Sequence, residues 1–92
     1  TDGNVIRINL PQLTDERKKE YEKVIKKMTE ETRIRIRGAR DEANREVKKM
    51  EGEGGLSEDA AFKKKEEIQK LIDRVNKEIE QILENKIKEI FE

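Results

Sequence analysis

Residues 51–59 read Glu51-Gly52-Glu53-Gly54-Gly55-Leu56-Ser57-Glu58-Asp59, and this stretch decides the fold because it interrupts an otherwise helical sequence. Glycine occupies three of the four positions from 52 to 55, and such a cluster between periodic segments marks a turn. Ser57 then has the side chain of a helix N-cap, and the two acidic residues after it suit the positive end of a helix dipole. We therefore predict a turn over residues 51–56 and a helix over residues 57–91.

A second long helix is predicted before this turn, over residues 14–50. Thr14 is a suitable N-cap, and two acidic residues follow it in the first turn. Apolar or small side chains recur at steps of three or four residues, which average about 3.6 residues and match an α-helix. We expect these positions to form the packing face: Tyr21, Val24, Met28, Thr32, Ile36, Ala39, Ala43, Val47 and Met50. Gly38 lies in the helix interior, where glycine costs roughly 1 kcal/mol relative to alanine.

The helix over residues 57–91 has a broader apolar face than one partner helix would cover. Two overlapping stripes run along it, at positions 68, 72, 75, 79 and 82 and at positions 71, 75, 79, 83 and 87. A single neighbour needs only a narrow seam, so two stripes predict two neighbours. The short link makes the two helices antiparallel. The predicted fold is all-α: a long antiparallel helical hairpin whose core is completed by a third helix or by a second copy of the chain.

Residues 1–13 are predicted to form a short extended arm. The segment Val5–Leu10 alternates like a strand, and Pro11 ends it because proline cannot donate to a strand ladder. No partner strand is predicted elsewhere in the sequence. We therefore divide the chain into an arm, residues 1–13, and a helical hairpin, residues 14–92.

Composition excludes several classes of function. The 92 residues are 48% charged and only 3% aromatic, which is typical of long helices or coiled coils. Cysteine and histidine are absent, so disulfides, Cys- or His-based metal sites and a His-based catalytic triad are excluded. We expect no cofactor, no metal and no enzymatic activity. The sequence shows no long apolar run and no signal peptide, which predicts a cytoplasmic protein without a membrane partner.

A run of arginines is the candidate functional surface. Four arginines fall within eight residues, at positions 33, 35, 37 and 40. On a helix, Arg33, Arg37 and Arg40 share one face, and Asn44 continues it, because residues three and four apart are neighbours. The planar guanidinium group suits phosphate and carboxylate ligands. The alternative is a solvated face with ion pairs such as Arg37 to Asp41.

The distribution of charge is compatible with a local basic surface. The net charge is zero, which argues against bulk charge-driven binding of nucleic acid. Residues 1–50 nevertheless contain 14 basic and 10 acidic residues, whereas residues 51–92 contain 8 and 12. This distribution leaves room for a local basic surface on the first half of the chain.

Four separated motifs resemble those of the ribosome recycling factor family, in the same order and with similar gaps. Ile6–Lys18 is similar to the family's extended segment, proline pair and Leu-Thr-Glu-Glu-Arg-Arg motif. Ile36–Asn44 resembles Val-Arg-Asn-Val-Arg-Arg-Asp-Ala-Asn, Leu56–Asp59 resembles Ile-Ser-Glu-Asp, and Ile68–Asp73 resembles Val-Gln-Lys-Leu-Thr-Asp. The resemblance extends from about Val5 to the end of the chain.

This resemblance implies a fold and a function. In the family, three long helices form domain I and a small β domain forms domain II, so this chain corresponds to the hinge and the second and third helices of a three-helix bundle. The implied function is ribosome recycling after termination, in which domain I binds ribosomal RNA of the large subunit and elongation factor G helps to split the subunits. Arg37 and Arg40 match arginines of the family's RNA-contacting motif, and Arg17 and Lys18 match a basic pair near the hinge.

The sequence departs from the family pattern at four of these positions. Gln12 replaces the second proline of the hinge, and Gly38 and Ala39 replace Asn and Val. Asp41 stands where a second consecutive arginine is usual, which reduces the local positive charge.

The competing hypothesis is a structural one, namely an antiparallel coiled coil, natural or designed, that serves for oligomerisation. The family resemblance implies the large ribosomal subunit and elongation factor G as partners. The broad apolar face and the structural hypothesis imply a homodimer of this chain.

Overall fold

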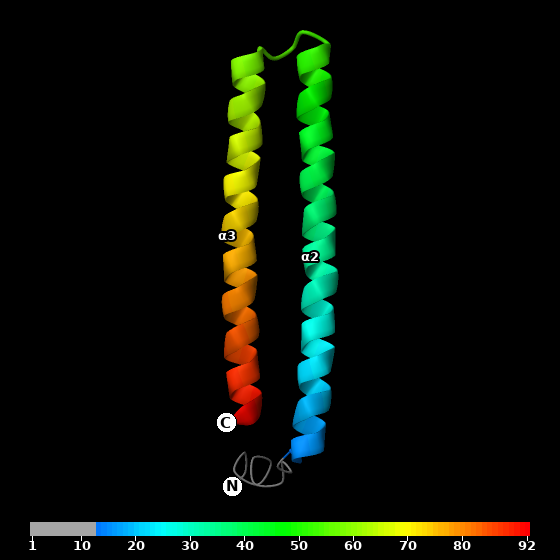
Figure 1. Cartoon of the computed structure of the whole chain (residues 1–92), viewed down its shortest axis with the longest axis vertical. Helices are drawn as coiled ribbons and strands as arrows, with labels where there is room; N and C mark the ends of the chain where they lie inside the picture. Colours follow the sequence, from blue (N-terminus) through cyan, green and yellow to red (C-terminus); the bar gives the residue numbers. More distant parts are fainter. Residues whose placement is uncertain (1–12) are drawn as a thin grey trace, which may run out of the picture.

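The protein is a hairpin of two long antiparallel α-helices, as the computed structural model of residues 13–92 shows (Figure 1). Helix α2 spans Asp15–Gly52 and helix α3 spans Glu58–Phe91, and together they account for every regular element of the described residues. The prediction of an all-α hairpin is confirmed. The predicted extended arm lies outside the described residues, apart from Leu13.

Both helices begin at the predicted caps. The Thr14 hydroxyl oxygen accepts a hydrogen bond from the backbone N–H of Arg17 at 3.1 Å. The Ser57 hydroxyl oxygen accepts one from the backbone N–H of Ala60, also at 3.1 Å. Each bond satisfies one of the amide groups that a helix start leaves without a partner, and each cap is followed by two acidic residues.

The turn between the helices is built on one glycine in a left-handed conformation. Helix α2 continues to Gly52, two residues beyond the predicted end. Gly54 then adopts a φ of 83°, and its N–H donates to the Glu51 carbonyl while the N–H of Gly55 donates to the Met50 carbonyl. These two bonds form a Schellman motif, which commonly ends a helix at a glycine. The motif reverses the chain and brings α3 back along α2 (Figure 1).

The face that α2 turns toward α3 differs from the predicted packing face. Buried and half-buried side chains recur at steps of 4, 3 and 4 residues, repeated three times: Lys18, Glu22, Ile25, Thr29, Arg33, Ile36, Arg40, Asn44, Val47 and Glu51. An eleven-residue repeat corresponds to about 3.67 residues per turn, which gives nearly straight or slightly right-handed helix pairs. Polar residues with long aliphatic stems occupy several of these positions, as amphipathic side chains can. The Thr29 hydroxyl is satisfied within α2 by donating to the Ile25 carbonyl at 2.8 Å.

Much of the predicted packing face of α2 is therefore exposed. The prediction is confirmed at Ile36, Ala43 and Val47. It is wrong at the other six positions, which are exposed: Tyr21, Val24, Met28, Thr32, Ala39 and Met50. The physical reason is that α3 covers only one side of a broad apolar face. Among residues 13–92, only Val47 and Ala61 are buried, with 6% and 2% of their surface exposed.

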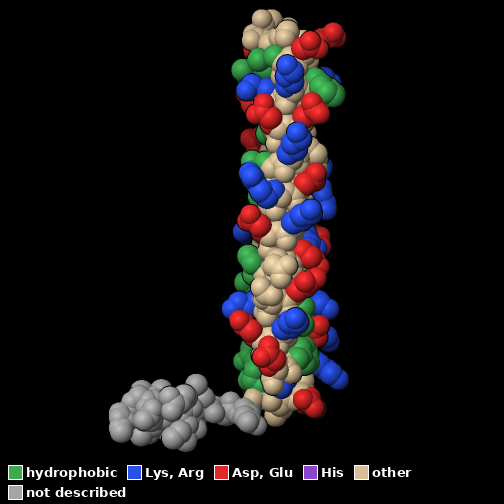
Figure 2. Space-filling view, turned by 90° about the vertical axis from the view of Figure 1, so that its left-hand side faces the viewer, with side chains coloured by type: hydrophobic (Ala, Val, Ile, Leu, Met, Phe, Trp, Pro, Cys, Tyr) green, Lys and Arg blue, Asp and Glu red, His purple; other side chains and the backbone are tan. Residues whose placement is uncertain are grey.

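Helix α3 likewise has both covered and open apolar positions. Ile72, Val75 and Ile79 are half-buried against α2, whereas Leu71 and Ile82 are exposed. Seen from the α3 side, the molecule presents interspersed acidic and basic side chains along its length, with hydrophobic side chains gathered toward the edges of the view (Figure 2). Each of the two predicted seams is thus half-buried except at one residue, Ile82 in the first seam and Leu71 in the second, so the hairpin covers neither seam completely.

Candidate functional site

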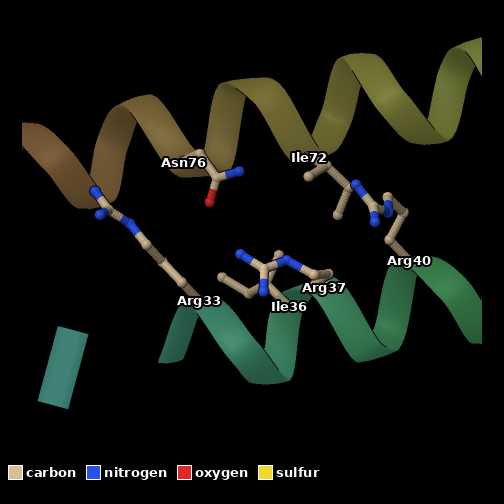
Figure 3. Close-up of a pocket in the computed structure, with 6 residues that line it drawn as sticks. All are labelled: Arg33, Ile36, Arg37, Arg40, Ile72 and Asn76. Atoms are coloured by element: carbon tan, nitrogen blue, oxygen red, sulfur yellow. The ribbon is translucent and has the colours of Figure 1, made fainter. Parts of the chain in front are cut away.

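Three of the predicted site arginines surround one hollow at the edge of the interface between the helices. The hollow has a volume of about 250 Å³ and is lined by Arg33, Ile36, Arg37, Arg40, Ile72 and Asn76. The arginine side chains rise from α2 toward α3, and Ile72 and Asn76 point toward them from α3 (Figure 3). We call these six residues the arginine hollow. The four-residue and three-residue steps predicted this common face, and the opposing helix supplies its far wall.

The apolar floor of the arginine hollow explains how three guanidinium groups can lie so close to an interface. Ile36 and Ile72 are half-buried between the helices, and arginine stems can pack along such surface while their charged ends stay in water. The side chains of Arg33 and Arg40 retain 31% and 30% of their surface exposed. The guanidinium groups therefore remain accessible to an anion in solution.

Two of the three arginines already have acidic partners. Arg33 donates through Nη2 to the Glu80 carboxylate, which comes from α3 and joins the two helices. Arg40 donates through Nε and Nη2 to the Asp41 Oδ1 atom at 3.3 and 3.1 Å. The alternative ion pair between Arg37 and Asp41 is not formed, since Asp41 is turned to Arg40 instead. Within residues 13–92, Arg37 makes no ion pair and is the uncompensated cation of the hollow.

The other predicted site residues lie beside the hollow or far from it. Asn44 is one turn beyond Arg40 and is half-buried, and its Oδ1 atom is buried without a hydrogen-bond partner in the described part of the chain. Arg17 and Lys18 lie at the start of α2, about 24 Å from Arg33 at about 1.5 Å per residue. Lys18 lines a separate hollow with Leu13, near the end of α3. The structure therefore brings three of the six residues together around one hollow, and their role in RNA binding stays a prediction.

A second hollow, which is apolar, lies on the opposite edge of the interface. It has a volume of about 370 Å³ and is lined by Ile25, Met28, Thr29, Thr32, Ile79, Ile82, Leu83 and Lys86. Thr32 precedes Arg33 by one residue, and one residue turns a helix by about 100°, so the two side chains flank the interface on different sides. Met28 and Ile82 are 60% and 59% exposed here. We call this surface, with Leu71, the apolar strip.

The described residues offer no obvious alternative chemistry. Over residues 13–92, no three acidic side chains converge as a cation site would need. Neither α2 nor α3 contains a stretch apolar enough and long enough to cross a bilayer. The arginine hollow and the apolar strip are therefore the two candidate functional surfaces of the described residues.

Comparison with known proteins identifies one family. Residues 1–91 match the sequence model of the family described as ribosome recycling factor. A ribosome-recycling factor of Alkaliphilus metalliredigens is 46% identical over 91 residues, which cover 99% of this chain and 49% of that protein. The proteins of the same name from Clostridioides difficile and Bacillus subtilis are 47% and 44% identical, over 99% and 100% of this chain and 49% and 50% of their own lengths. No solved structure matches the chain. The chain spans about half the length of these relatives.

Proposed function

Since this chain belongs to the ribosome recycling factor family, we propose that it acts in ribosome recycling after termination and binds ribosomal RNA of the large subunit through the arginine hollow. The observation that carries this proposal is the convergence of Arg33, Arg37 and Arg40 on one accessible hollow, with Arg37 uncompensated by any acidic side chain of residues 13–92. An arginine without an acidic partner can bind a phosphate group without first breaking an ion pair.

The geometry favours contact with the RNA backbone over reading of bases. The row from Arg33 to Arg40 extends about 10 Å along the helix, at about 1.5 Å per residue, so it can address more than one phosphate. Phosphate contacts fix register and orientation but carry no sequence information by themselves. Double-stranded RNA is recognised mostly in this way, by shape and by backbone contacts. The proposed action is therefore binding and positioning rather than a chemical step.

The resemblance to the family extends the proposal to a second partner. We propose that the complete protein acts together with elongation factor G to separate the subunits. The helical hairpin supplies the RNA-facing part of that action, and we expect the 92-residue chain alone to bind large subunits without splitting ribosomes. Asn44, Arg17 and Lys18 are proposed as additional RNA contacts, in line with their match to the family motifs.

The experiment that tests this function is cosedimentation with large ribosomal subunits at several salt concentrations. The Arg37→Ala/Arg40→Ala variant should bind at least tenfold more weakly, because a hydrogen bond to a charged group contributes about 1.5–3 kcal/mol. Its binding should also depend less on salt, since each phosphate contact contributes about 0.7–0.9 to the slope of log K against log salt. The matched control is Arg35→Ala/Arg45→Ala, which removes the same charge from exposed positions outside the hollow. Equal loss in both variants, or no loss in either, would reject the assigned surface.

A second candidate function, self-association, is favoured by the apolar strip. Met28, Leu71 and Ile82 are exposed along this strip, and contiguous exposed apolar surface marks interaction sites when it is large. Burying it is favourable by roughly 25 cal/mol per Å². We propose that a further helix covers it, either the third helix of a bundle, as the family resemblance implies, or α2 and α3 of a second copy. Sedimentation equilibrium separates these outcomes, because a folded chain that stays monomeric at high concentration excludes the homodimer.

A further inference from the structure

Glu80 is the one acidic side chain of α3 that forms an ion pair with an arginine of the arginine hollow within the described residues. The hollow itself is lined by three arginines, two isoleucines and an asparagine, and it has no acidic lining residue. Glu80 lies one turn along α3 from Asn76 and pairs with Arg33 across the interface. Its side chain is 50% exposed, so water and dissolved anions can reach the pair.

We propose that Glu80 is a built-in competitor for phosphate: it holds the Arg33 guanidinium in the absence of RNA and is displaced from it when RNA binds. This inference rests on the proposed function of the arginine hollow and names the residue that limits its affinity. A carboxylate and a phosphate present similar pairs of acceptor oxygens to the guanidinium fork, so one can replace the other. Only Arg37 is then ready to bind without first releasing a partner.

The ion pair between Arg33 and Glu80 is exposed, so a phosphate group can replace the Glu80 carboxylate. An exposed ion pair between side chains is weak, whereas a bound phosphate that meets several cations releases counterions and is held more strongly. Asp41 differs from Glu80 because it is adjacent to its partner Arg40 on α2. The pair of Arg40 with Asp41 therefore does not connect the two helices. Among the acidic residues of the described range, only Glu80 therefore couples occupancy of the hollow to a contact between α2 and α3.

The proposal predicts opposite effects on affinity and on stability when the charge of Glu80 is removed. Glu80→Gln should bind RNA about two- to fivefold more tightly, the range that corresponds to the free energy of an exposed ion pair. The same variant should unfold at an equal or slightly lower temperature, because the contact between the helices is weakened. A residue that only stabilised the hairpin would lower the unfolding temperature without raising affinity.

The test measures binding of the 92-residue chain to a short RNA duplex by fluorescence anisotropy, in a double-mutant cycle with Arg33. The four proteins are wild type, Glu80→Gln, Arg33→Ala and the double variant, since coupling between two sites is isolated by such a cycle. Glu78→Gln is the matched control, because it removes the same charge from an exposed position of α3 outside the hollow. We expect Glu80→Gln to tighten binding only while Arg33 is present, and Glu78→Gln to have a smaller effect.

Each outcome distinguishes this inference from the proposed function. If Glu80→Gln binds no better than Glu78→Gln, or if its gain persists without Arg33, the competitor role is overturned even when Arg37→Ala still weakens binding. If no variant binds the duplex, the inference and the proposed RNA contact both fail. If Glu80→Gln gains affinity for the duplex but Arg37→Ala/Arg40→Ala leaves binding to large subunits unchanged, the competitor role stands and the ribosomal role does not.

Discussion

Replacing Gly38 with alanine should stabilise the hairpin, although the residue lies among the arginines of the candidate site. Gly38 is in the middle of α2, on an exposed surface, and its backbone is helical. Beyond the backbone of its own helical turns and its chain neighbours, a Cβ atom built on it meets no atom within 4 Å. The substitution therefore adds no clash and leaves the arginine hollow intact.

The expected gain follows from the difference between glycine and alanine in a helix interior. Glycine is disfavoured there by roughly 0.5–1 kcal/mol, mainly because it loses more backbone freedom on folding. For a domain of this size, 1 kcal/mol shifts the midpoint of thermal unfolding by about 4–8 °C. Gly38→Ala should therefore raise the midpoint by about 2–8 °C.

Gly54 provides the matched control, because the same substitution should there have the opposite sign. Its φ of 83° lies in the left-handed region, where a Cβ atom costs roughly 1–2 kcal/mol. Both variants are measured by far-ultraviolet circular dichroism during heating, at one fixed protein concentration because self-association would change the midpoint. A lower midpoint for Gly38→Ala, or equal effects of the two substitutions, would refute the assignment of Gly38 to a regular helix interior.

Two further substitutions probe the start of α3 and the apolar strip. Ser57→Ala removes the hydroxyl that accepts from the Ala60 N–H, and it should cost about 1 kcal/mol of unfolding free energy in a urea titration; a change below a few tenths of this would argue against the cap. Ile82→Glu places a charge on the apolar strip and should weaken self-association in sedimentation experiments while helicity is kept. Phe62→Glu, at an equally exposed position outside the strip, should leave the association unchanged, and a similar loss in both variants would count against the strip as the interface.

The sequence predicts local structure well here because local signals are strong. Thr14 and Ser57 are followed by acidic residues, so both helix starts could be placed to the residue. Gly54 supplies the left-handed conformation that the turn needs. The end of α2 was missed by two residues because a glycine such as Gly52 is tolerated in a last helical turn, and periodicity alone does not define where the final hydrogen bonds lie.

The packing face of α2 could not be read from hydrophobicity, because an apolar row shows what can be buried and not what is buried. Met28 belongs to an apolar row that this hairpin leaves open, whereas Lys18 and Glu22 belong to the row that faces α3. The choice between rows depends on how α3 is placed by the turn and on which further helix is present. It is therefore a property of the assembly rather than of the α2 sequence.

The candidate site divides in the same way between local and tertiary information. Arg33, Arg37 and Arg40 were placed on one face by their spacing, which is a local property of a helix. The pair between Arg33 and Glu80 joins residues 47 positions apart, so the sequence did not predict it. Asp41 pairs with Arg40, whereas the sequence had suggested Arg37. The tertiary pair of Arg33 with Glu80 and the local pair of Arg40 with Asp41 together leave Arg37 without an acidic partner in the described residues.

The two edges of the hairpin make packing in a larger bundle compatible with the proposed RNA binding. A one-residue step turns the helix by about 100°, so Thr32 and Arg33 project to different sides of the same interface. Covering the apolar strip with another helix stabilises the hairpin, whose own buried core is limited to Val47 and Ala61 among residues 13–92. The same packing leaves the arginine hollow open, because it lies on the other edge. Stability and the proposed RNA binding therefore depend mainly on opposite edges of the same two helices, and the pair between Arg33 and Glu80 links the two.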